Sequence, residues 1–197
     1  MELAAIIVVC PRPEQAQAMA AGNSATPEAF AKVPLALLDV VGRSVVHHVI
    51  DRLLGAGVQA VTALVPESVD EAAGLHEDHA GAVCQTAADA WRAAEDSFSA
   101  YVADGFENIL LLRLGPYAEF SLPELLRFHR DRRQSATPVH DEQGWLDAAM
   151  VQAGRRSDAV FLLRNQMRAT RTPAEPWVAG GYVNRLESAR DLRRLAQ

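Results

Sequence analysis

The sequence predicts an α/β protein with a mainly parallel central sheet and helices on both of its faces. Continuous apolar runs at residues 3–9, 59–65 and 108–114 are typical of strands that are buried on both sides. Helical patterns follow two of these runs, and the loops between strands and helices are short, as in α/β folds. We therefore expect the three runs to lie side by side as parallel strands.

The remaining elements follow from apolar periodicity and from residues that begin or end helices. We expect helices at residues 14–21, 45–54, 68–75, 87–103, 122–133 and 188–195, and the pattern at 158–167 is ambiguous but favours a helix. We expect further strands at residues 82–84, 136–139, 146–151 and 178–183, and another apolar segment at 35–41. Ser44, Thr86 and Ser121 precede three of the helices and are expected to cap them.

The composition is that of one globular domain, which we expect to span residues 1–197. With 49% hydrophobic and 22% charged residues, the chain is neither a disordered tail, nor a collagen-like repeat, nor a disulfide-rich mini-protein. The longest apolar runs are far too short to cross a membrane, and no cationic segment precedes the first. We therefore expect a cytoplasmic protein with no membrane partner. Two cysteines, Cys10 and Cys84, do not make a disulfide framework and are expected to be free thiols.

Charge is unevenly distributed along the chain, whose net charge is −6. Residues 1–120 carry a net charge of −10 and residues 121–197 a net charge of +4, with arginine supplying nearly all the positive charge. Two interpretations stay open for the C-terminal part: a solvated arginine-rich surface, or a surface for an anion or an acidic partner. The sequence has no run of Lys and Arg interleaved with aromatic residues, so we expect no nucleic-acid partner.

Four segments, at residues 34–57, 85–95, 109–130 and 182–193, match a family pattern in their order and spacing. The first, PLALLDVVGRSVVHHVIDRLLGAG, resembles the sugar-nucleotidyltransferase segment in which Pro-Lys-Pro-Leu-Leu-Pro-Val precedes Gly-Lys-Pro and a helix ending in Ala-Gly. The second, QTAADAWRAAE, is similar to the family's Gly-Thr-Ala-Gly-Ala helix start beside the nucleobase and the sugar. The last two resemble the central strand with its following helix, and the aromatic-x-Asp segment with its Thr-Pro-Glu-Asp-Leu helix.

The resemblance implies a Rossmann-like nucleotidyltransferase fold of the GT-A type. It also implies the family's reaction, in which a nucleotidyl group passes from a nucleoside triphosphate to a sugar phosphate, with Mg²⁺ and with release of pyrophosphate. The matched positions imply three nucleotide-binding residues, with Arg12 beside the phosphates and Gln85 and Thr86 beside the base and the sugar.

The phosphate loop of the family is altered in this sequence. The family's Gly-x-Gly-Thr-Arg falls on residues 11–15, where Pro11 and Pro13 replace both glycines. Proline has no N–H to donate and fixes φ at about −65°, so this backbone is not expected to cradle a triphosphate as a glycine loop does. Glu14 adds a negative charge, which leaves Arg12 as the only attractive charge nearby.

Three further functional positions of the family are also replaced. The lysine that neutralises phosphate falls on Leu35, and the two metal-binding aspartates fall on Pro116 and Asn184. Lys32 could take the place of the lysine only in a shifted loop, and Glu119 could reach a metal only by a different path. Since a lone neutral amide is a poor Mg²⁺ site, we assign no catalytic residue and no metal ligand.

The sequence therefore predicts a degenerate nucleotidyltransferase-like domain, catalytically impaired, that acts in ligand binding or assembly. Its expected ligand is a nucleotide or nucleotide sugar at Arg12, Gln85 and Thr86, and its expected protein partner is a second copy or another protein. No cofactor is expected unless the alternative holds, an active Mg²⁺-dependent nucleotidyltransferase with relocated catalytic residues. A third hypothesis is a module whose missing C-terminal β-helix leaves an apolar patch for association.

Overall fold

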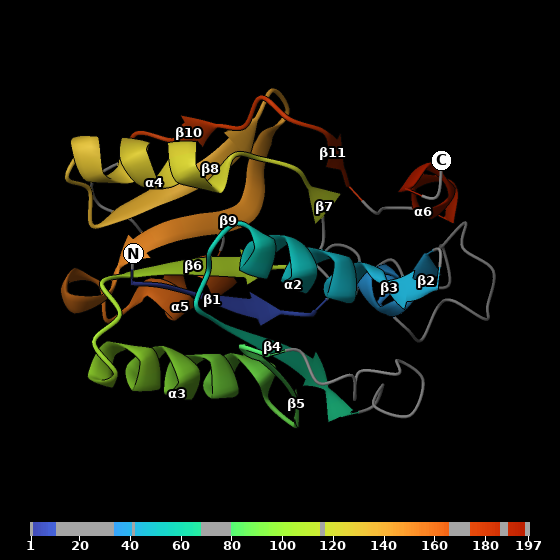
Figure 1. The fold of residues 1–197 in the computed structure, drawn as a ribbon, viewed down its shortest axis with the longest axis horizontal. Coiled ribbons are helices and arrows are strands. Elements are labelled where there is room, and N and C mark those ends of the chain that lie inside the picture. Colours follow the sequence, from blue (N-terminus) through green and yellow to red (C-terminus); the bar gives the residue numbers. More distant parts are fainter. Residues whose placement is uncertain are drawn as a thin grey trace.

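A seven-stranded mixed sheet forms the centre of the structure, a computed structural model (Figure 1). The structure describes residues 2–10, 34–40, 42–67, 80–114, 117–165, 174–185 and 189–195. Across the sheet the strands follow the order β10 (Trp177–Val178), β8 (Ala136–Asp141), β9 (Gly144–Gln152), β6 (Asn108–Arg113), β1 (Leu3–Val8), β4 (Ala60–Pro66) and β5 (Ala82–Ala87). Two short ribbons join β2 (Asp39–Val40) to β3 (Arg43–Ser44) and β7 (Tyr117–Ala118) to β11 (Val183–Asn184).

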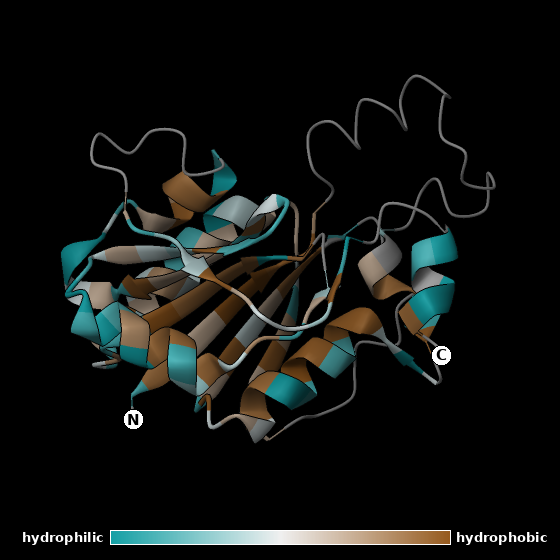
Figure 2. Ribbon diagram, turned by 90° about the horizontal axis from the view of Figure 1, so that it is seen from above, coloured by the Kyte–Doolittle hydropathy of each residue, from teal (hydrophilic) through white to brown (hydrophobic). Residues whose placement is uncertain are grey.

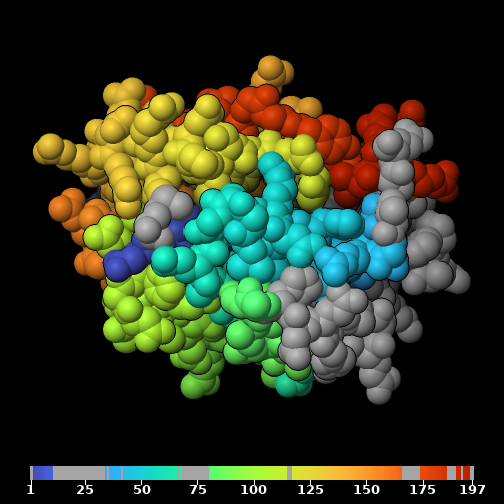
Figure 3. All heavy atoms as spheres, in the orientation of Figure 1, coloured from blue at the N-terminus to red at the C-terminus, as the bar shows by residue number. Residues whose placement is uncertain are grey.

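Helices cover both faces of this sheet. The described residues form α2 (Val45–Gly55), α3 (Ala90–Ala103), α4 (Leu122–Asp131), α5 (Ala159–Arg164) and α6 (Ala189–Leu195), with 3₁₀ turns at Leu35–Leu37 and Ala153–Arg155. α2 and α4 pack on one face, where Figure 3 shows their atoms in cyan and yellow, and α3 and α5 pack on the other. Arg52 of α2 donates hydrogen bonds to the backbone oxygens of Ala118 and Phe120, which ties α2 to the chain before α4.

The three apolar runs form neighbouring parallel strands, as predicted. β1 pairs in parallel with β4, which places Ile6 opposite Thr62, and with β6, which places Ile6 opposite Leu111. β5 continues the parallel arrangement beyond β4, and β10 lies parallel to β8. β9 pairs antiparallel with both β6 and β8. The predicted α/β fold with a mainly parallel sheet is therefore confirmed.

Alternate residues of the buried strands face two hydrophobic layers, as strand geometry requires. In β1, Ile7 belongs to the layer that holds Ile50 of α2 and Leu125 of α4, whereas Ile6 belongs to the layer that holds Phe98 of α3. All six residues of β1 are buried. Figure 2 shows the strands largely in brown, between helices that carry teal hydrophilic residues. Burial on both faces explains why the first apolar run is continuous.

The start of α3 differs from the prediction. Thr86 does not cap this helix, because it lies in β5. This strand pairs with β4 along its whole length, up to Ala87. The cap is Asp89, whose carboxylate accepts hydrogen bonds from the backbone N–H groups of Trp91 and Arg92 at 3.0 and 3.1 Å. The predicted strand at 82–84 is therefore longer, and the helix begins three residues later.

The two other predicted caps differ from each other. Ser121 caps α4, since its Oγ accepts a hydrogen bond from the N–H of Glu124 at 3.4 Å. Ser44 precedes α2 but makes no side-chain cap. Its Oγ instead shares a hydrogen bond of 2.8 Å with Nδ1 of His47. The remaining predicted helices and strands within the described residues are present, apart from small differences at their ends.

The segment at 178–183 is not one strand, contrary to the prediction. Its first residue ends β10 in the main sheet, and its last residue begins β11 in a separate ribbon. The adjacent Gly180 and Gly181 lie between the two strands. The predicted helices at 14–21 and 68–75 lie outside the described residues. Within those residues, no helix is long and apolar enough to cross a membrane.

The buried His129 of α4 makes the stability of the protein depend on pH. Its Nδ1 shares a hydrogen bond of 2.8 Å with Oγ1 of Thr137 on β8. Burial, with a smaller effect of Arg130, lowers its pKa to about 4. The unfolded chain therefore takes up this proton first as the pH falls. The stability from neutral His129 is complete above about pH 6.5 and is lost as the pH falls towards 4.

Between pH 7 and pH 4.5, we expect the uptake of a proton by His129 in the unfolded chain to lower the free energy of unfolding by about 2 kcal/mol. Urea denaturation at both pH values measures this loss. His129→Gln is the control, because Gln keeps a polar group near Thr137 and does not titrate. The same pH dependence in wild type and variant would contradict the prediction.

Candidate functional site

The carboxyl ends of the parallel strands lie along one edge of the sheet, at the right of Figure 1. One row of paired residues crosses this edge: Val8 of β1 lies opposite Arg113 of β6 and Leu64 of β4, and Leu64 lies opposite Gln85 of β5. In open α/β sheets, ligands bind outside the carboxyl ends of the strands. This carboxyl edge is therefore the candidate functional site.

A buried ion pair occupies the carboxyl end of β6. Nη2 of Arg113 lies 2.6 Å from Oδ1 of Asp147 on β9, and both side chains are only 2% exposed. Asp147 adopts a φ of +56°, which few residues other than glycine, asparagine and aspartate tolerate. Nε of Arg113 is buried and has no hydrogen-bond partner within the described residues. The cation at the end of the central strand is thus neutralised inside the protein.

Cys10, just after β1, lies beside this pair in an environment that disfavours its thiolate. Burial raises its pKa to about 11, although the nearby Arg113 favours the thiolate. At neutral pH the side chain is therefore a protonated, half-buried thiol. Attack as a nucleophile requires the thiolate, which is scarce at this pKa. Cys10 and Cys84 are both free, as predicted.

Two tyrosines and a carboxylate lie in or directly beside the β7–β11 ribbon, beyond the strand ends. The hydroxyl of Tyr117 donates a hydrogen bond to Oε1 of Glu119 at 2.9 Å, and the Tyr117 and Tyr182 rings lie 6.5 Å apart. Burial, followed by Glu119, raises the pKa of Tyr117. These side chains line a cavity of about 190 Å³ together with His48 of α2 and Arg194 of α6. This cavity combines aromatic walls with charges of both signs.

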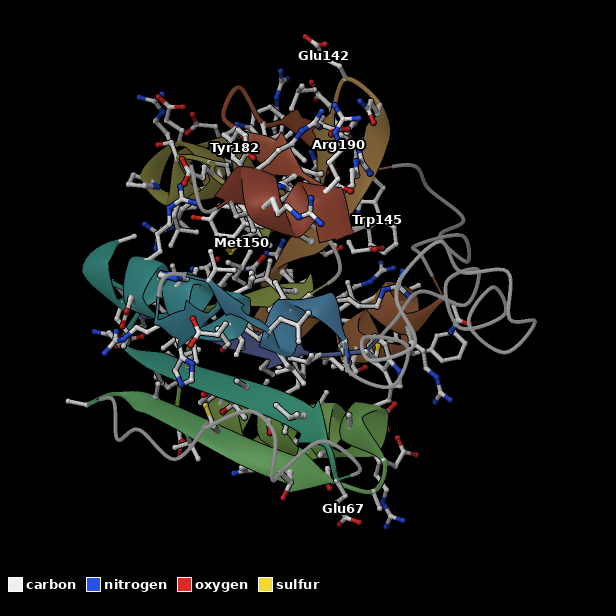
Figure 4. All side chains as sticks on the ribbon, turned by 90° about the vertical axis from the view of Figure 1, so that its right-hand side faces the viewer. Glu67, Glu142, Trp145, Met150, Tyr182 and Arg190 are labelled. Atoms are coloured by element: carbon white, nitrogen blue, oxygen red, sulfur yellow. The ribbon has the colours of Figure 1, made fainter. Side chains whose placement is uncertain are left out.

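Figure 4 faces the carboxyl edge and shows how widely its side chains are spread. Glu67, after β4, lies at the bottom of the view. Tyr182, just before β11, and Arg190, in α6, lie at the top. Trp145 of β9 lies to the right, where its backbone oxygen accepts a hydrogen bond from Arg185 at 3.3 Å. The ribbon and α6 therefore lie towards one end of the row of strand ends, and β4 lies towards the other.

Asn184 and Arg185 of the C-terminal segment are tied to the protein itself. Nδ2 of Asn184 donates to the backbone oxygen of Asp191 at 2.6 Å and to the hydroxyl of Tyr182 at 3.2 Å. Arg185 forms a close ion pair with Asp141 at the tip of the β8–β9 hairpin. Both side chains therefore hold the last segment against the body of the protein.

The predicted nucleotide-binding residues are placed only in part. Gln85 and Thr86 are exposed near the carboxyl end of the edge strand β5. As neighbours on a strand they point to opposite faces, with Cys84 packed in the α2 layer. The helix start does not lie directly after them as expected, because α3 begins at Ala90 and the carboxylate of Asp89 caps it. Arg12 lies outside the described residues, as do residues 11–33.

The described residues do not fit a Mg²⁺ site at the family's metal position. Mg²⁺ prefers six oxygen ligands, including carboxylates, whereas Asn184 is neutral and uses its amide N–H groups inside the protein. Within the described parts of the chain, no three side chains of His, Cys, Asp or Glu gather around a common point. The other family position, Pro116, lies outside the described residues, so the absence of a metal there stays a prediction.

Comparisons with known proteins agree with the fold. No protein-family model matches the chain, and no curated protein matches its sequence. A putative glucose-1-phosphate thymidylyltransferase from Bacillus anthracis matches with a TM-score of 0.68 and 8% identity, over 98% of this chain and 94% of that chain. HddC from Yersinia pseudotuberculosis matches with a TM-score of 0.67 and 9% identity, over 100% and 98%. UDP-glucose pyrophosphorylase from Acinetobacter baumanii matches with a TM-score of 0.63 and 8% identity, over 100% and 92%.

These matches define the class of fold. The chain has a Rossmann-like nucleotidyltransferase fold, and it resembles the sugar-phosphate nucleotidyltransferases in architecture, as the sequence predicts. At identities below 10% the likeness extends to the fold and no further.

Proposed function

We propose that this chain is a catalytically impaired nucleotidyltransferase-like domain that acts in ligand binding or assembly. The observation that carries the proposal is the buried pair of Arg113 and Asp147 at the carboxyl end of β6, because both charges are already neutralised inside the protein. Asn184 adds an amide where the family has a metal-binding aspartate. Nucleotidyl transfer depends on electrostatic stabilisation of the phosphates, and the residues at these positions offer little of it.

The proposed ligand is a nucleotide or a nucleotide sugar. One solved neighbour, HddC, was crystallised with GMP-PN, and a further one, Rv0371c from Mycobacterium tuberculosis, with manganese. On this chain, Gln85 and Thr86 are exposed at the strand end where the family places the base and the sugar. Arg12 is proposed as the contact nearest the phosphates. Binding through hydrogen bonds to the base and sugar alone would gain little from added phosphates.

We therefore expect a nucleoside and its triphosphate with Mg²⁺ to differ in affinity by less than about tenfold, or roughly 1.4 kcal/mol. Calorimetric titration of both ligands measures the difference. Gln85→Ala should weaken binding, whereas Val83→Ala, also exposed on β5, should leave it unchanged. A triphosphate that binds a hundredfold tighter would contradict the proposal, since it would require an intact phosphate site.

The second candidate is an active nucleotidyltransferase with relocated catalytic groups. It is favoured by Glu119, a carboxylate that lines the cavity beside Tyr117. Release of pyrophosphate from a nucleoside triphosphate, a sugar phosphate and Mg²⁺ tests this candidate. Release that is lost in Glu119→Gln but kept in the exposed Glu124→Gln would support an enzyme. No release above the protein-free rate supports the impaired domain.

Assembly is the proposed role if neither ligand binds. β5 is one of the two edge strands of the seven-stranded sheet, and Val83 on it is 54% exposed. Edge strands offer backbone groups to a second chain. Light scattering of the purified protein, with Val83→Lys as the variant, distinguishes a self-associating module from a monomer.

A further inference from the structure

A second cavity lies at the amino ends of the parallel strands, at the opposite edge of the sheet from the candidate site. It has a volume of about 180 Å³ and is bordered by the start of β6, the end of α4 and the end of β9. We call it the amino-edge cavity. Three arginines line it. Arg130 lies at the end of α4, Arg133 lies just after that helix, and Arg155 lies in the 3₁₀ turn that follows β9. One carboxylate, Glu107, lines it as well.

The charges around the amino-edge cavity are poorly balanced. Arg130 lies 3.6 Å from Glu107, and both side chains are at least half exposed. Arg133 and Arg155 have no ion pair within the described residues. Three guanidinium groups and one carboxylate leave a formal charge of +2 around one small cavity. The whole chain has a net charge of −6. Like charges held around one hollow repel each other, and a bound anion would relieve this repulsion.

Polar groups complete the wall of the amino-edge cavity. His129 lines it and is neutral at neutral pH, because burial lowers its pKa to about 4. With Nδ1 bonded to Thr137, its Nε2 remains for a ligand in the tautomer that carries the proton there. Gln134 also lines the cavity, and its Oε1 is buried with no hydrogen-bond partner within the described residues. Because this oxygen only accepts hydrogen bonds, it suits a water or the O–H group of a partly protonated oxyanion.

The backbone at Arg133 supports the same conclusion. Arg133 has a φ of +52° and directly follows the C-cap residue Arg132 of α4. Helices usually place glycine at this position, because a side chain is strained there. An arginine that keeps this strained backbone projects a guanidinium group into the wall of the cavity, which a glycine would not supply.

We propose that the amino-edge cavity binds a small anion of the phosphate class, either orthophosphate or pyrophosphate. Pockets that enclose drug-sized ligands measure roughly 300–1,000 Å³, so a cavity of about 180 Å³ suits an inorganic anion better than a whole nucleotide. Guanidinium groups are the preferred partners of phosphate oxygens. The dipole of α4 opposes an anion here, but its roughly half a unit charge is smaller than the net charge of the side chains.

Calorimetric titration with orthophosphate and with pyrophosphate at low ionic strength tests the site. Arg155→Gln should weaken pyrophosphate binding by about tenfold, since it removes charged hydrogen bonds. The matched control is Arg132→Gln, because Arg132 lies at the same helix end but pairs with Glu175 at 3.1 Å and does not line the cavity. The control should bind as tightly as the wild type. Arg133→Gly should weaken binding and raise the melting temperature, because it removes the backbone strain.

Three outcomes would overturn the proposal. The first is equal weakening by Arg155→Gln and Arg132→Gln, which would indicate non-specific attraction to a cationic surface. The second is loss of binding in Gln85→Ala, which would place the anion at the carboxyl edge. The third is no heat of binding with either anion at millimolar concentration. Since Gln85 and Arg155 lie at opposite edges of the sheet, the same variants separate this site from the proposed nucleotide site.

Discussion

Asp147→Asn is expected to lower the free energy of unfolding by about 3–5 kcal/mol, because it leaves the guanidinium of Arg113 buried without its countercharge. Asn tolerates the φ of +56° at this position nearly as well as Asp, so the backbone should contribute little to the loss. For a chain of this length, we expect the melting temperature to fall by roughly 10 °C. Thermal and urea denaturation at pH 7 measure both quantities.

Two controls separate burial from charge pairing alone. Arg43 and Asp51 form an ion pair at the same distance of 2.6 Å, but their side chains are 43% and 41% exposed. Asp51→Asn should therefore cost less than about 1 kcal/mol. The double variant Arg113→Met with Asp147→Asn should recover much of the stability, because no charge is left buried. The prediction is contradicted if the double variant loses as much free energy of unfolding as the two single variants together.

The central strands could be predicted from sequence because each is buried on both faces. Burial on both sides replaces the usual alternation with an unbroken apolar run, as in residues 3–9 and 108–114. Three such runs with helical patterns between them leave few arrangements other than neighbouring parallel strands. The observed pairing of β1 with β4 and β6 follows from that constraint.

The boundary between β5 and α3 could not be predicted, because two capping residues compete there. Thr86 and Asp89 are both good N-caps, and nothing local decides between them. Pairing with β4 does decide, since it extends β5 through Ala87 and leaves Asp89 at the helix start. The difference changes which side chain satisfies the first N–H groups of the helix. The carboxylate of Asp89 accepts from Trp91 and Arg92, in place of the expected hydroxyl of Thr86.

The candidate site depends on contacts that no local pattern reveals. Arg113 and Asp147 are 34 residues apart, and only the antiparallel pairing of β6 with β9 brings them together. In the sequence, only the position of Arg113 near the end of the apolar run 108–114 indicates a charge at this edge of the sheet. The nucleotide-binding assignment of Arg12, Gln85 and Thr86 rests on the family resemblance and stays a prediction.

The uneven charge of the chain is explained in part by the structure. Within the described residues, several C-terminal arginines pair with nearby carboxylates, among them Arg132 with Glu175 and Arg185 with Asp141. Arg133 and Arg155 instead face the amino-edge cavity. The first group of arginines is paired within the protein, and an anion surface at Arg133 and Arg155 stays a proposal. Sequence alone could not assign them, because pairing depends on how the hairpin and α4 fold together.

Gly181→Ala is expected to separate β11 from β7 at a cost of about 3 kcal/mol, at the upper end of the usual cost of overpacking. A Cβ on Gly181 would lie 1.7 Å from the backbone oxygen of Glu119, and backbone cannot move aside as a side-chain end can. The N–H of Glu119 donates to the oxygen of Tyr182 at 2.7 Å, so the clash falls beside a bond that holds the ribbon. Urea denaturation measures the loss.

The neighbouring glycine supplies the control for this prediction. A Cβ on Gly180 would meet no atom of the described residues within 4 Å, so Gly180→Ala should change stability by less than about 0.5 kcal/mol. Tyrosine ring signals in NMR should shift in Gly181→Ala alone, because the contact of Tyr117 with Tyr182 depends on the ribbon. Equal effects of the two substitutions would show that the ribbon tolerates the added atom. If Gly181→Ala also leaves nucleoside affinity unchanged, the ligand contacts the β5 side of the carboxyl edge and not the tyrosine cavity.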